Sequence, residues 1–130
     1  EMIVFNGVIP YRGTQGAAGY DLTSRKAVTV FPGAIEVIPS GTSAHFPSNI
    51  VGMVCSRSGL STKGIMVVNA PGIIDSDYNK PIDIIITNIG KEPFYVTPGM
   101  RIAQLVFTPV VLATDIVTTQ REGGLGSTGE

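Results

Sequence analysis

Short runs of β-branched and other apolar residues recur along the chain, and turn-forming residues separate each run from the next. The clearest runs are Ala27–Phe31, Ala34–Ile38, Ile50–Cys55, Ile82–Thr87 and Ile102–Thr108. Between the runs stand turn signals, namely Asn6-Gly7, Pro32-Gly33, Pro71-Gly72, Asn88-Ile89-Gly90-Lys91 and Pro98-Gly99. Runs of this kind between such signals predict short β-strands joined by tight turns.

Helices have little room in this pattern. The chain holds 16 glycines and 9 prolines, too many for a helix of several turns, and only a single turn near Leu60–Lys63 is expected. We find no internal repeat and no alternation of strands with helices. Many short strands with short connections predict an all-β sandwich or barrel.

The composition changes near the C-terminus, after Val117. The last residues contain four glycines and one large apolar side chain, Leu125. Such a segment buries too little surface to offset its ordering entropy. We therefore predict one β-domain over residues 1–118 and a flexible Gly-rich arm over residues 119–130.

Charge narrows the classes of partner. The formal net charge is −1, and the Lys and Arg residues form no basic stripe, so we expect no direct contact with nucleic acid. With 43% hydrophobic and only 15% charged residues, the composition mildly favours an oligomer. Any polyanionic partner should be a small molecule.

The single cysteine, Cys55, excludes an internal disulfide and a Cys-based zinc site, and the single histidine, His45, excludes a histidine metal cluster. No apolar run is long enough to span a membrane, and no secretory signal pattern is present. We expect a protein of the cytoplasm, the nucleus or a virus-infected cell, not a secreted one.

Two segments offer side chains for binding a phosphate. At the end of the run Ile50–Cys55, Arg57 supplies a guanidinium fork, and Ser58 with Gly59 supplies a hydroxyl and a free N–H. In the arm, glycines precede Ser127 and Thr128. Taken alone, the first segment equally describes a Ser-rich helix start beside a solvated Arg, and the second a loose tail.

A third segment offers a general base. The residues Pro71-Gly72 predict the tip of a hairpin, and Asp75 follows Ile73 and Ile74, so that alternation places Asp75 on the face opposite Ile74. An acid held there could take a proton from water. The same residues, with Asp77 and Tyr78, also describe an ordinary turn.

Two polar residues lie within strand-like surroundings. Gln104 interrupts an apolar run and must find hydrogen-bond partners there, in a core network or in a site. Asp21 lies between Tyr20 and Leu22, so its carboxylate lies on the other face from those side chains. The local sequence does not decide whether that face is solvent or a site.

Five of these segments occur in an order that is far more specific than any one of them. They are Ala18–Leu22, Arg57–Leu60, Gly72–Tyr78, Arg101–Leu105 and Gly123–Gly129. In sequence and order they closely resemble the five motifs of the trimeric dUTPase family, and the resemblance spans the chain.

The resemblance implies a jelly-roll-like β fold (the β-clip fold of dUTPases) and a homotrimer, with each site assembled from several subunits and closed by the C-terminal arm. It implies hydrolysis of dUTP to dUMP and pyrophosphate by in-line attack of water on the α-phosphate, with Mg²⁺ as cofactor. That activity would limit the incorporation of uracil into DNA and would supply dUMP for dTMP synthesis.

The resemblance also implies roles for single residues. Asp75 would be the general base, and Gln104 would help bind the α-phosphate and position the water. Asp21 would contact Mg²⁺ through water. The substrate would be bound by Arg57, Ser58 and Gly59 at the phosphates, by Asn69, Ile74 and Tyr78 at the uracil and deoxyribose, and by Arg121, Gly124, Leu125, Ser127 and Thr128 of the arm.

Four positions depart from the family pattern. Leu125 stands where an aromatic side chain usually stacks on uracil, and one residue is missing between Arg121 and the glycines that follow. Asn79-Lys80 replaces the common Arg-Gly, and Met100 replaces a usual acid. The arm is therefore expected to hold the base less firmly. Two alternatives stay open: a catalytically weak nucleotide-binding regulator with the same fold, and a dCTP deaminase.

Overall fold

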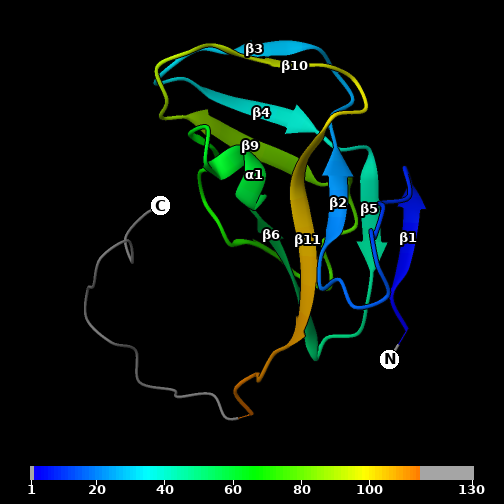
Figure 1. Ribbon diagram of the computed structural model, residues 1–130. Helices are drawn as coiled ribbons and strands as arrows, with labels where there is room; N and C mark the ends of the chain where they lie inside the picture. Colours follow the sequence, from blue (N-terminus) through cyan, green and yellow to red (C-terminus); the bar gives the residue numbers. More distant parts are fainter. Residues whose placement is uncertain (1, 115–130) are drawn as a thin grey trace, which may run out of the picture.

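The computed structural model describes residues 2–114, and strands predominate in them. A single helical turn, α1 (Ser58–Ser61), lies between the sixth and seventh strands (Figure 1). The strands are β1 (Val4–Gly7), β2 (Tyr20–Thr23), β3 (Val28–Val30), β4 (Ile35–Pro39), β5 (Thr42–His45), β6 (Ile50–Cys55), β7 (Ile65–Val67), β8 (Gly72–Ile74), β9 (Asp83–Asn88), β10 (Phe94–Val96) and β11 (Arg101–Pro109). The predicted all-β fold is confirmed.

The longest strand, β11, organises the largest sheet. Its order is β2-β11-β6-β8, and the pairs β2–β11, β11–β6 and β6–β8 are all antiparallel. Gln104 of β11 pairs with Asp21 on one side and with Cys55 on the other. The register of this sheet therefore brings together three segments that are far apart in the chain.

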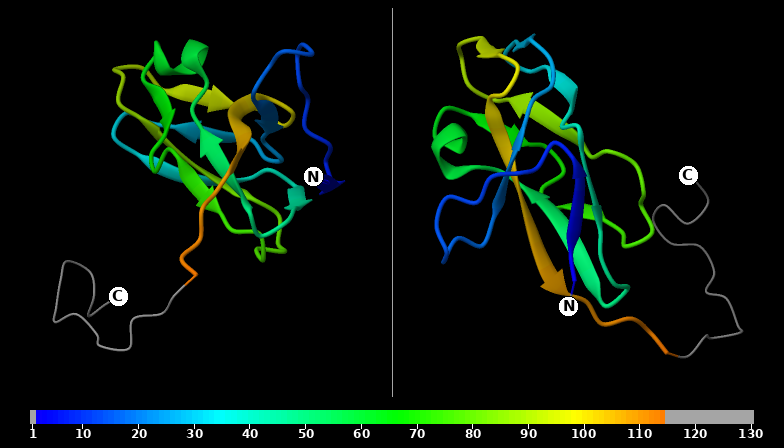
Figure 2. Two further views of the ribbon diagram at one scale, coloured as in Figure 1. Left: turned by 90° about the horizontal axis from the view of Figure 1, so that it is seen from below. Right: turned by 90° about the vertical axis from the view of Figure 1, so that its right-hand side faces the viewer.

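Three smaller sheets complete the domain. Their orders are β4-β9-β7, β1-β5 and β10-β3. The β4-β9-β7 sheet and the β3–β10 pair lie at the upper end of the domain in Figure 1, while the β1–β5 pair runs beside the largest sheet. Figures 1 and 2 show the start of β1 and the end of β11 at the lower end.

The core lies between the sheets and is almost wholly aliphatic. Its most deeply buried members each have 0% exposed surface: Leu22, Val30, Ile38, Ile84, Ile86, Ala103 and Leu105. They come from five strands of three sheets, so the same side chains that close the core hold the largest sheet against the upper one. At about 25 cal/mol per Å² of apolar surface, this burial supplies the main stabilisation.

The strand predictions hold well where an apolar run is long. The run Ile50–Cys55 is β6 from end to end, and Ala27–Phe31, Ala34–Ile38, Ile82–Thr87 and Ile102–Thr108 contain β3, β4, β9 and β11 to within a residue or two. The expected helical turn is present but begins at Ser58. The turns at Pro32-Gly33 and Pro98-Gly99 are closed by bonds from Ala34 N to Phe31 O (2.9 Å) and from Met100 N to Thr97 O (3.0 Å).

Two turn predictions are wrong. Asn6-Gly7 is the end of β1, where these residues pair with Ser43 and Thr42 of β5. Pro71-Gly72 is not the tip of a hairpin, because β7 before it pairs with β9, whereas β8 after it pairs with β6. The Pro-Gly segment instead carries the chain from one sheet to another, and the pairing partners that decide this lie far away in sequence.

The boundary predicted at residue 118 lies outside the described residues. The last strand, β11, ends at Pro109. Within residues 2–114, no helix has the length and apolarity that a membrane span requires.

Candidate active site

A polar cavity opens where β2, β6 and β11 lie side by side. It has a volume of about 210 Å³ and is lined by Asp21, Arg57, Ser58, Gly59 and Gln104. All five were predicted as site residues from three separate segments. The antiparallel register described above brings them to one place, because Asp21 and Cys55 flank Gln104 in neighbouring strands.

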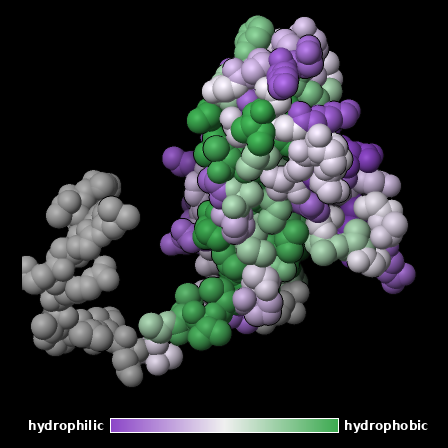
Figure 3. Space-filling view, turned by 60° about the vertical axis from the view of Figure 1, so that its left-hand side comes forward, coloured by the Kyte–Doolittle hydropathy of each residue, from purple (hydrophilic) through white to green (hydrophobic). Residues whose placement is uncertain are grey.

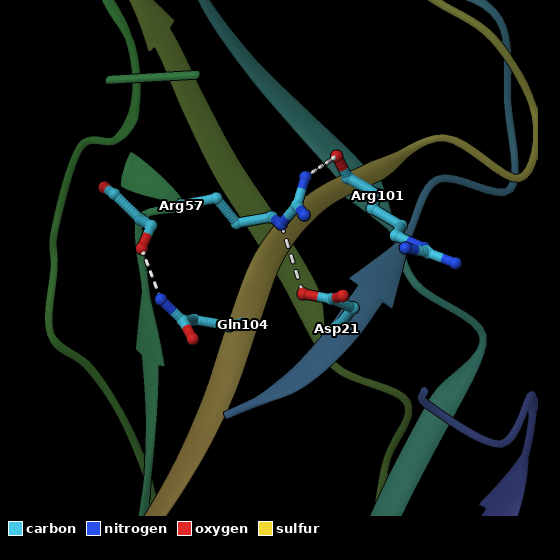
Figure 4. A network of polar contacts seen from close by, with 5 residues as sticks. Asp21, Arg57, Arg101 and Gln104 are labelled. Atoms are coloured by element: carbon cyan, nitrogen blue, oxygen red, sulfur yellow. Dashed lines mark hydrogen bonds and ion pairs between the residues drawn. The ribbon is translucent and has the colours of Figure 1, made fainter. Parts of the chain in front are cut away.

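Arg57 is held at two points of this cavity (Figure 4). Its Nε donates to Asp21 Oδ1 at 3.1 Å, and its Nη1 donates to the main-chain carbonyl of Arg101 at 3.3 Å. The side chains of Arg57 and Asp21 are 34% and 17% exposed, so solvent screens the ion pair only in part. These two contacts fix the plane of the guanidinium, and no group of the described residues accepts a hydrogen bond from Nη2, which can therefore bind an anion.

Gln104 has the hydrogen-bond partner that a polar residue in an apolar strand requires. Its Nε2 donates to the main-chain carbonyl of Ser56 at 2.9 Å (Figure 4). Ser56 is anchored in turn, since its Oγ accepts a hydrogen bond from Val67 N at 2.9 Å. The amide of Gln104 is thus hydrogen-bonded to Ser56, the residue that precedes Arg57. Gln104 and Arg57, both predicted to bind phosphate, are therefore held by the same short segment of main chain.

Ser58 and Gly59 are exposed and begin α1 directly after Arg57. The first main-chain bond of this turn is donated by Ser61 to Arg57 O at 3.0 Å. The N–H groups of Ser58 and Gly59 therefore have no acceptor within the turn. Together with the Ser58 hydroxyl, they add neutral donors to the cation of Arg57, which suits the cavity to a phosphate chain.

Asp75 lies elsewhere. It is exposed in the turn after β8, where Tyr78 N donates to Asp75 O at 3.0 Å, and it lines a different cavity of about 360 Å³ with Ser48, Val51 and Ile73 among others. As predicted, successive side chains of β8 lie on opposite faces of the strand: Ile74 packs against the core, and Ile73 is 58% exposed.

The sheet register fixes how far Asp75 is from the polar cavity. Ile74 pairs with Gly52, so Asp75 lies level with Val51, and Gln104 lies level with Cys55 on the far side of β6. Four residues along a strand span about 13 Å, and two strand spacings add about 10 Å across, so the two main chains are about 16 Å apart. A base that shares a water with Gln104 must lie within about 3 Å of that water. One chain alone does not bring these two groups together.

The predicted uracil and deoxyribose contacts lie with Asp75. Asn69 is exposed in the segment before β8, and its side chain lies against Gly72. Ile74 is half-buried in β8. Tyr78 is 37% exposed, and its hydroxyl donates to Pro81 O at 3.3 Å. Asn69, Ile74 and Tyr78 thus belong to the segment of Asp75, apart from the polar cavity.

Metal-binding groups are few in the part of the chain that the structure describes. No set of three or more His, Cys, Asp or Glu side chains there could hold an ion by itself. His45 is an exposed residue at the end of β5, and Cys55 ends β6, where burial raises the pKa of its thiol. Neither lines either cavity.

A family model described as dUTPase matches residues 6–129. The chain belongs to the dUTPase family. A protein named deoxyuridine 5'-triphosphate nucleotidohydrolase from Chlamydia caviae is 43% identical, with 94% of this chain and 91% of that protein covered. One of the same name from Anaeromyxobacter is also 43% identical, covering 93% and 87%. The structure of a dUTPase from Streptococcus mutans is similar with a TM-score of 0.78 at 28% identity, covering 85% of this chain and 98% of that one.

Membership of the dUTPase family confirms the resemblance carried by the five ordered motifs, and with it the predicted enzyme class, dUTP diphosphatase, at family level. The arm residues Arg121, Gly124, Leu125, Ser127 and Thr128 lie outside the described residues, as does the predicted segment 119–130.

Sequence reasoning missed the main-chain groups that hold the dUTPase motifs in place. The carbonyls of Ser56 and Arg101 fix Gln104 and Arg57, and a carbonyl leaves no residue signature in a sequence. Sequence reasoning also missed the stacking of Arg101 over the ring of Tyr11, 4.5 Å from its centroid. The Arg of that motif therefore packs beside the site, and only its carbonyl contacts Arg57.

Proposed function

We propose that this chain hydrolyses dUTP to dUMP and pyrophosphate; its relatives carry the name deoxyuridine 5'-triphosphate nucleotidohydrolase. The observation that carries the proposal is the polar cavity of Asp21, Arg57, Ser58, Gly59 and Gln104, in a chain of the dUTPase family. A guanidinium and neutral donors at one place match a chain of phosphates, which carries several negative charges with many acceptor oxygens.

The phosphates bind in this cavity. The Nη2 of Arg57 and the N–H groups of Ser58 and Gly59 donate to phosphate oxygens, and Gln104 donates its second Nε2 hydrogen to the α-phosphate. Donors that are already fixed need little rearrangement when charge develops on the phosphate oxygens. The Asp21 and Arg101 contacts of Arg57 supply that preorganisation.

Mg²⁺ fits this donor set as a partner of the substrate. The cavity offers one carboxylate, Asp21, and Mg²⁺ commonly binds through one or two carboxylates with substrate phosphates and water. Asp21 would contact the ion through water. When bound, the ion would neutralise charge on the triphosphate.

Water is activated by Asp75, which takes a proton as the water attacks the α-phosphorus in line. Because Asp75 and Gln104 are about 16 Å apart within one chain, the Asp75 of one copy serves the polar cavity of another. The number of copies comes from the resemblance to trimeric dUTPases, which implies a homotrimer with three composite sites. Asn69 and Ile74 contact the uracil edge, and Tyr78 lies against the deoxyribose, where a 2′-hydroxyl would collide with it. The arm, with Arg121, Gly124, Leu125, Ser127 and Thr128, closes over the site.

An apolar sheet face supports the oligomer. On the outer face of the β4-β9-β7 sheet, Ile35 and Val37 are 60% and 52% exposed, and Val37 pairs with Ile85. An antiparallel sheet with aliphatic side chains on both faces is unusual unless both faces are covered. Figure 3 shows a second group of hydrophobic atoms at the lower end of the domain. Near the end of the described residues, Val111 and Leu112 are 97% and 58% exposed.

In the cell, this reaction would keep dUTP low and so limit the incorporation of uracil into DNA, while supplying dUMP for dTMP synthesis. The chain would act in the compartment where nucleotides are made or DNA is copied.

The activity is tested by pyrophosphate release from dUTP, dCTP, dTTP and UTP in the presence of Mg²⁺. We expect turnover of dUTP alone, and a kcat for Asp75→Asn lower by about 10²- to 10⁴-fold, the usual contribution of a general base. Asp77→Asn, two residues away, is the matched control and should keep its rate. Binding of dUTP without turnover would favour a regulator, and release of ammonia from dCTP a deaminase.

The composite site is tested by mixing two inactive variants. Asp75→Asn and Arg57→Ala are unfolded together and refolded, so that mixed trimers form. Across all the trimers of an equal mixture, an intact Asp75 from one variant meets an intact Arg57 from the other at about a quarter of the sites, because each residue is intact in half of the chains. We expect about a quarter of the activity of the unaltered chain to return. If mixing restores no activity, Asp75 and Arg57 of one site come from the same chain, or the two residues do not act in the same reaction.

A further inference from the structure

Gly19, the residue immediately before β2, lies directly against the side chain of Gln104. A Cβ on residue 19 would overlap Gln104 Oε1 and would lie 3.0 Å from its Cδ and 3.2 Å from its Cβ. The backbone itself does not require glycine here, since Gly19 is not one of the residues with positive φ. What this position requires is the absence of a side chain.

Contacts on both sides fix the amide of Gln104. On one side, Nε2 donates to Ser56 O at 2.9 Å; because a carbonyl accepts only from the NH₂ end, the orientation of the amide is unambiguous. On the other side, Oε1 lies over Gly19. One N–H of Nε2 and the lone pairs of Oε1 remain to act on a ligand.

We infer that Gly19 is a positioning residue for the hydrolysis: it leaves the space in which the Gln104 amide holds the α-phosphate and the attacking water. The inference rests on the function proposed above, in which Gln104 acts on those groups. A methyl group on residue 19 would displace the amide, and a displacement of about 1 Å in a reacting group can cost about 10²-fold in rate.

The experiment compares four variants of the full chain: Gly19→Ala, Gln104→Ala, the double variant, and Gly16→Ala. Gly16 is a matched control from the same loop, because a Cβ there meets nothing within 4 Å. For each variant, kcat and KM for dUTP are measured with the Tm and the subunit mass.

We expect Gln104→Ala to lower kcat by about 10²-fold, the effect of removing one preorganised donor. Gly19→Ala should lower kcat by about 10-fold or more, with KM within about 3-fold, because the lost contacts act in the transition state. The double variant should match Gln104→Ala to within about 2-fold, since Gly19 acts only through that side chain. Gly16→Ala should keep its kcat, and all four should keep their Tm and mass.

Each other result has a distinct meaning. A slow Gln104→Ala beside a fully active Gly19→Ala overturns the inference and leaves the proposed function standing. Losses that add in the double variant also overturn it, because Gly19 would then act through something else. A Gln104→Ala variant as fast as the unaltered chain removes the role of Gln104 and the inference with it. Absence of dUTP turnover in the unaltered chain overturns the proposed function itself.

Discussion

At the scale of single residues, Asp21 contacts Arg57 and, in the proposed mechanism, also Mg²⁺. Its Oδ1 accepts from Arg57 Nε at 3.1 Å, and among the described residues the same carboxylate is the only one that lines the polar cavity. In the proposed mechanism, it orients a phosphate-binding cation and contacts Mg²⁺ through water. A charge placed between two cations holds both near the triphosphate.

Replacing Asp21 by Asn keeps the size of the side chain and removes its charge. We expect the Mg²⁺ concentration for half-maximal dUTP turnover to rise by about 10-fold or more, as for the loss of an outer-shell partner. The Tm should change little, because a partly exposed ion pair contributes only about 0.2–1 kcal/mol. A Mg²⁺ titration of turnover beside thermal unfolding measures both. As a control, Glu92→Gln changes an exposed acid outside the polar cavity and should leave both the Mg²⁺ requirement and the Tm unchanged. If Asp21→Asn needs no more Mg²⁺ than the unaltered chain, Asp21 does not contact the ion.

At the scale of elements, a buried amide joins three segments of the upper sheets. Asn88, which ends β9, has 0% exposed surface. Its Nδ2 donates to the carbonyls of Val30 at 2.9 Å and Glu92 at 2.7 Å, and its Oδ1 accepts from Gly90 N at 2.9 Å. One side chain thus fixes the β9–β10 connection against β3.

Asn88→Ala would leave these three main-chain groups without their partner. Since each unsatisfied buried group costs about 1–3 kcal/mol, we expect a loss of about 3 kcal/mol in the free energy of unfolding, measured by urea denaturation at one fixed protein concentration. Asn6→Ala, at an exposed position of β1, should stay within about 0.5 kcal/mol. A loss for Asn88→Ala no larger than that of the control would mean that water replaces the amide.

The strands and the turns differ in how far the sequence alone predicts them. The extent of β6 could be predicted from the run Ile50–Cys55 alone, because a strand buried on its inner face needs apolar residues at regular positions. The conformation of the Pro71-Gly72 segment could not be predicted in this way, since it depends on β7 pairing with β9 and β8 pairing with β6. Local sequence specifies a turn, but the partners of the flanking strands are set by the packing of the whole domain.

In the candidate active site, too, some features follow from local sequence and others only from the register of the strands. The need of Gln104 for a partner follows from its sequence, because an unpaired polar group in an apolar strand is costly. That the partner is the Ser56 carbonyl follows only from the register of β11 and β6. Likewise, the motif order suggests that Asp75 and Gln104 act together, yet only the register shows that one chain holds them apart.

At the scale of the whole molecule, one chain of this dUTPase-family protein leaves apolar surface exposed and its proposed catalytic groups separated. Partner copies would remedy both. The outer face of the β4-β9-β7 sheet is one such apolar surface, with Ile35 and Val37 on its edge strand and Ile85 beside them. If copies pack through this face, a charge placed within it must be desolvated on assembly and would oppose that assembly.

Val37→Asp places such a charge where Val37 is 52% exposed and pairs with Ile85. We expect the particle mass, measured by light scattering after size exclusion, to fall from three times 13.6 kDa to the mass of one chain. Turnover of dUTP should fall with it, since Asp75 and Gln104 then no longer meet, while the far-UV circular dichroism of the strands is kept. Thr97→Asp, which adds the same charge at an exposed position in the turn before β11, should stay trimeric and active. A Val37→Asp chain that keeps the full particle mass would assign the assembly to another surface, and one that becomes a monomer with full activity would contradict the composite site.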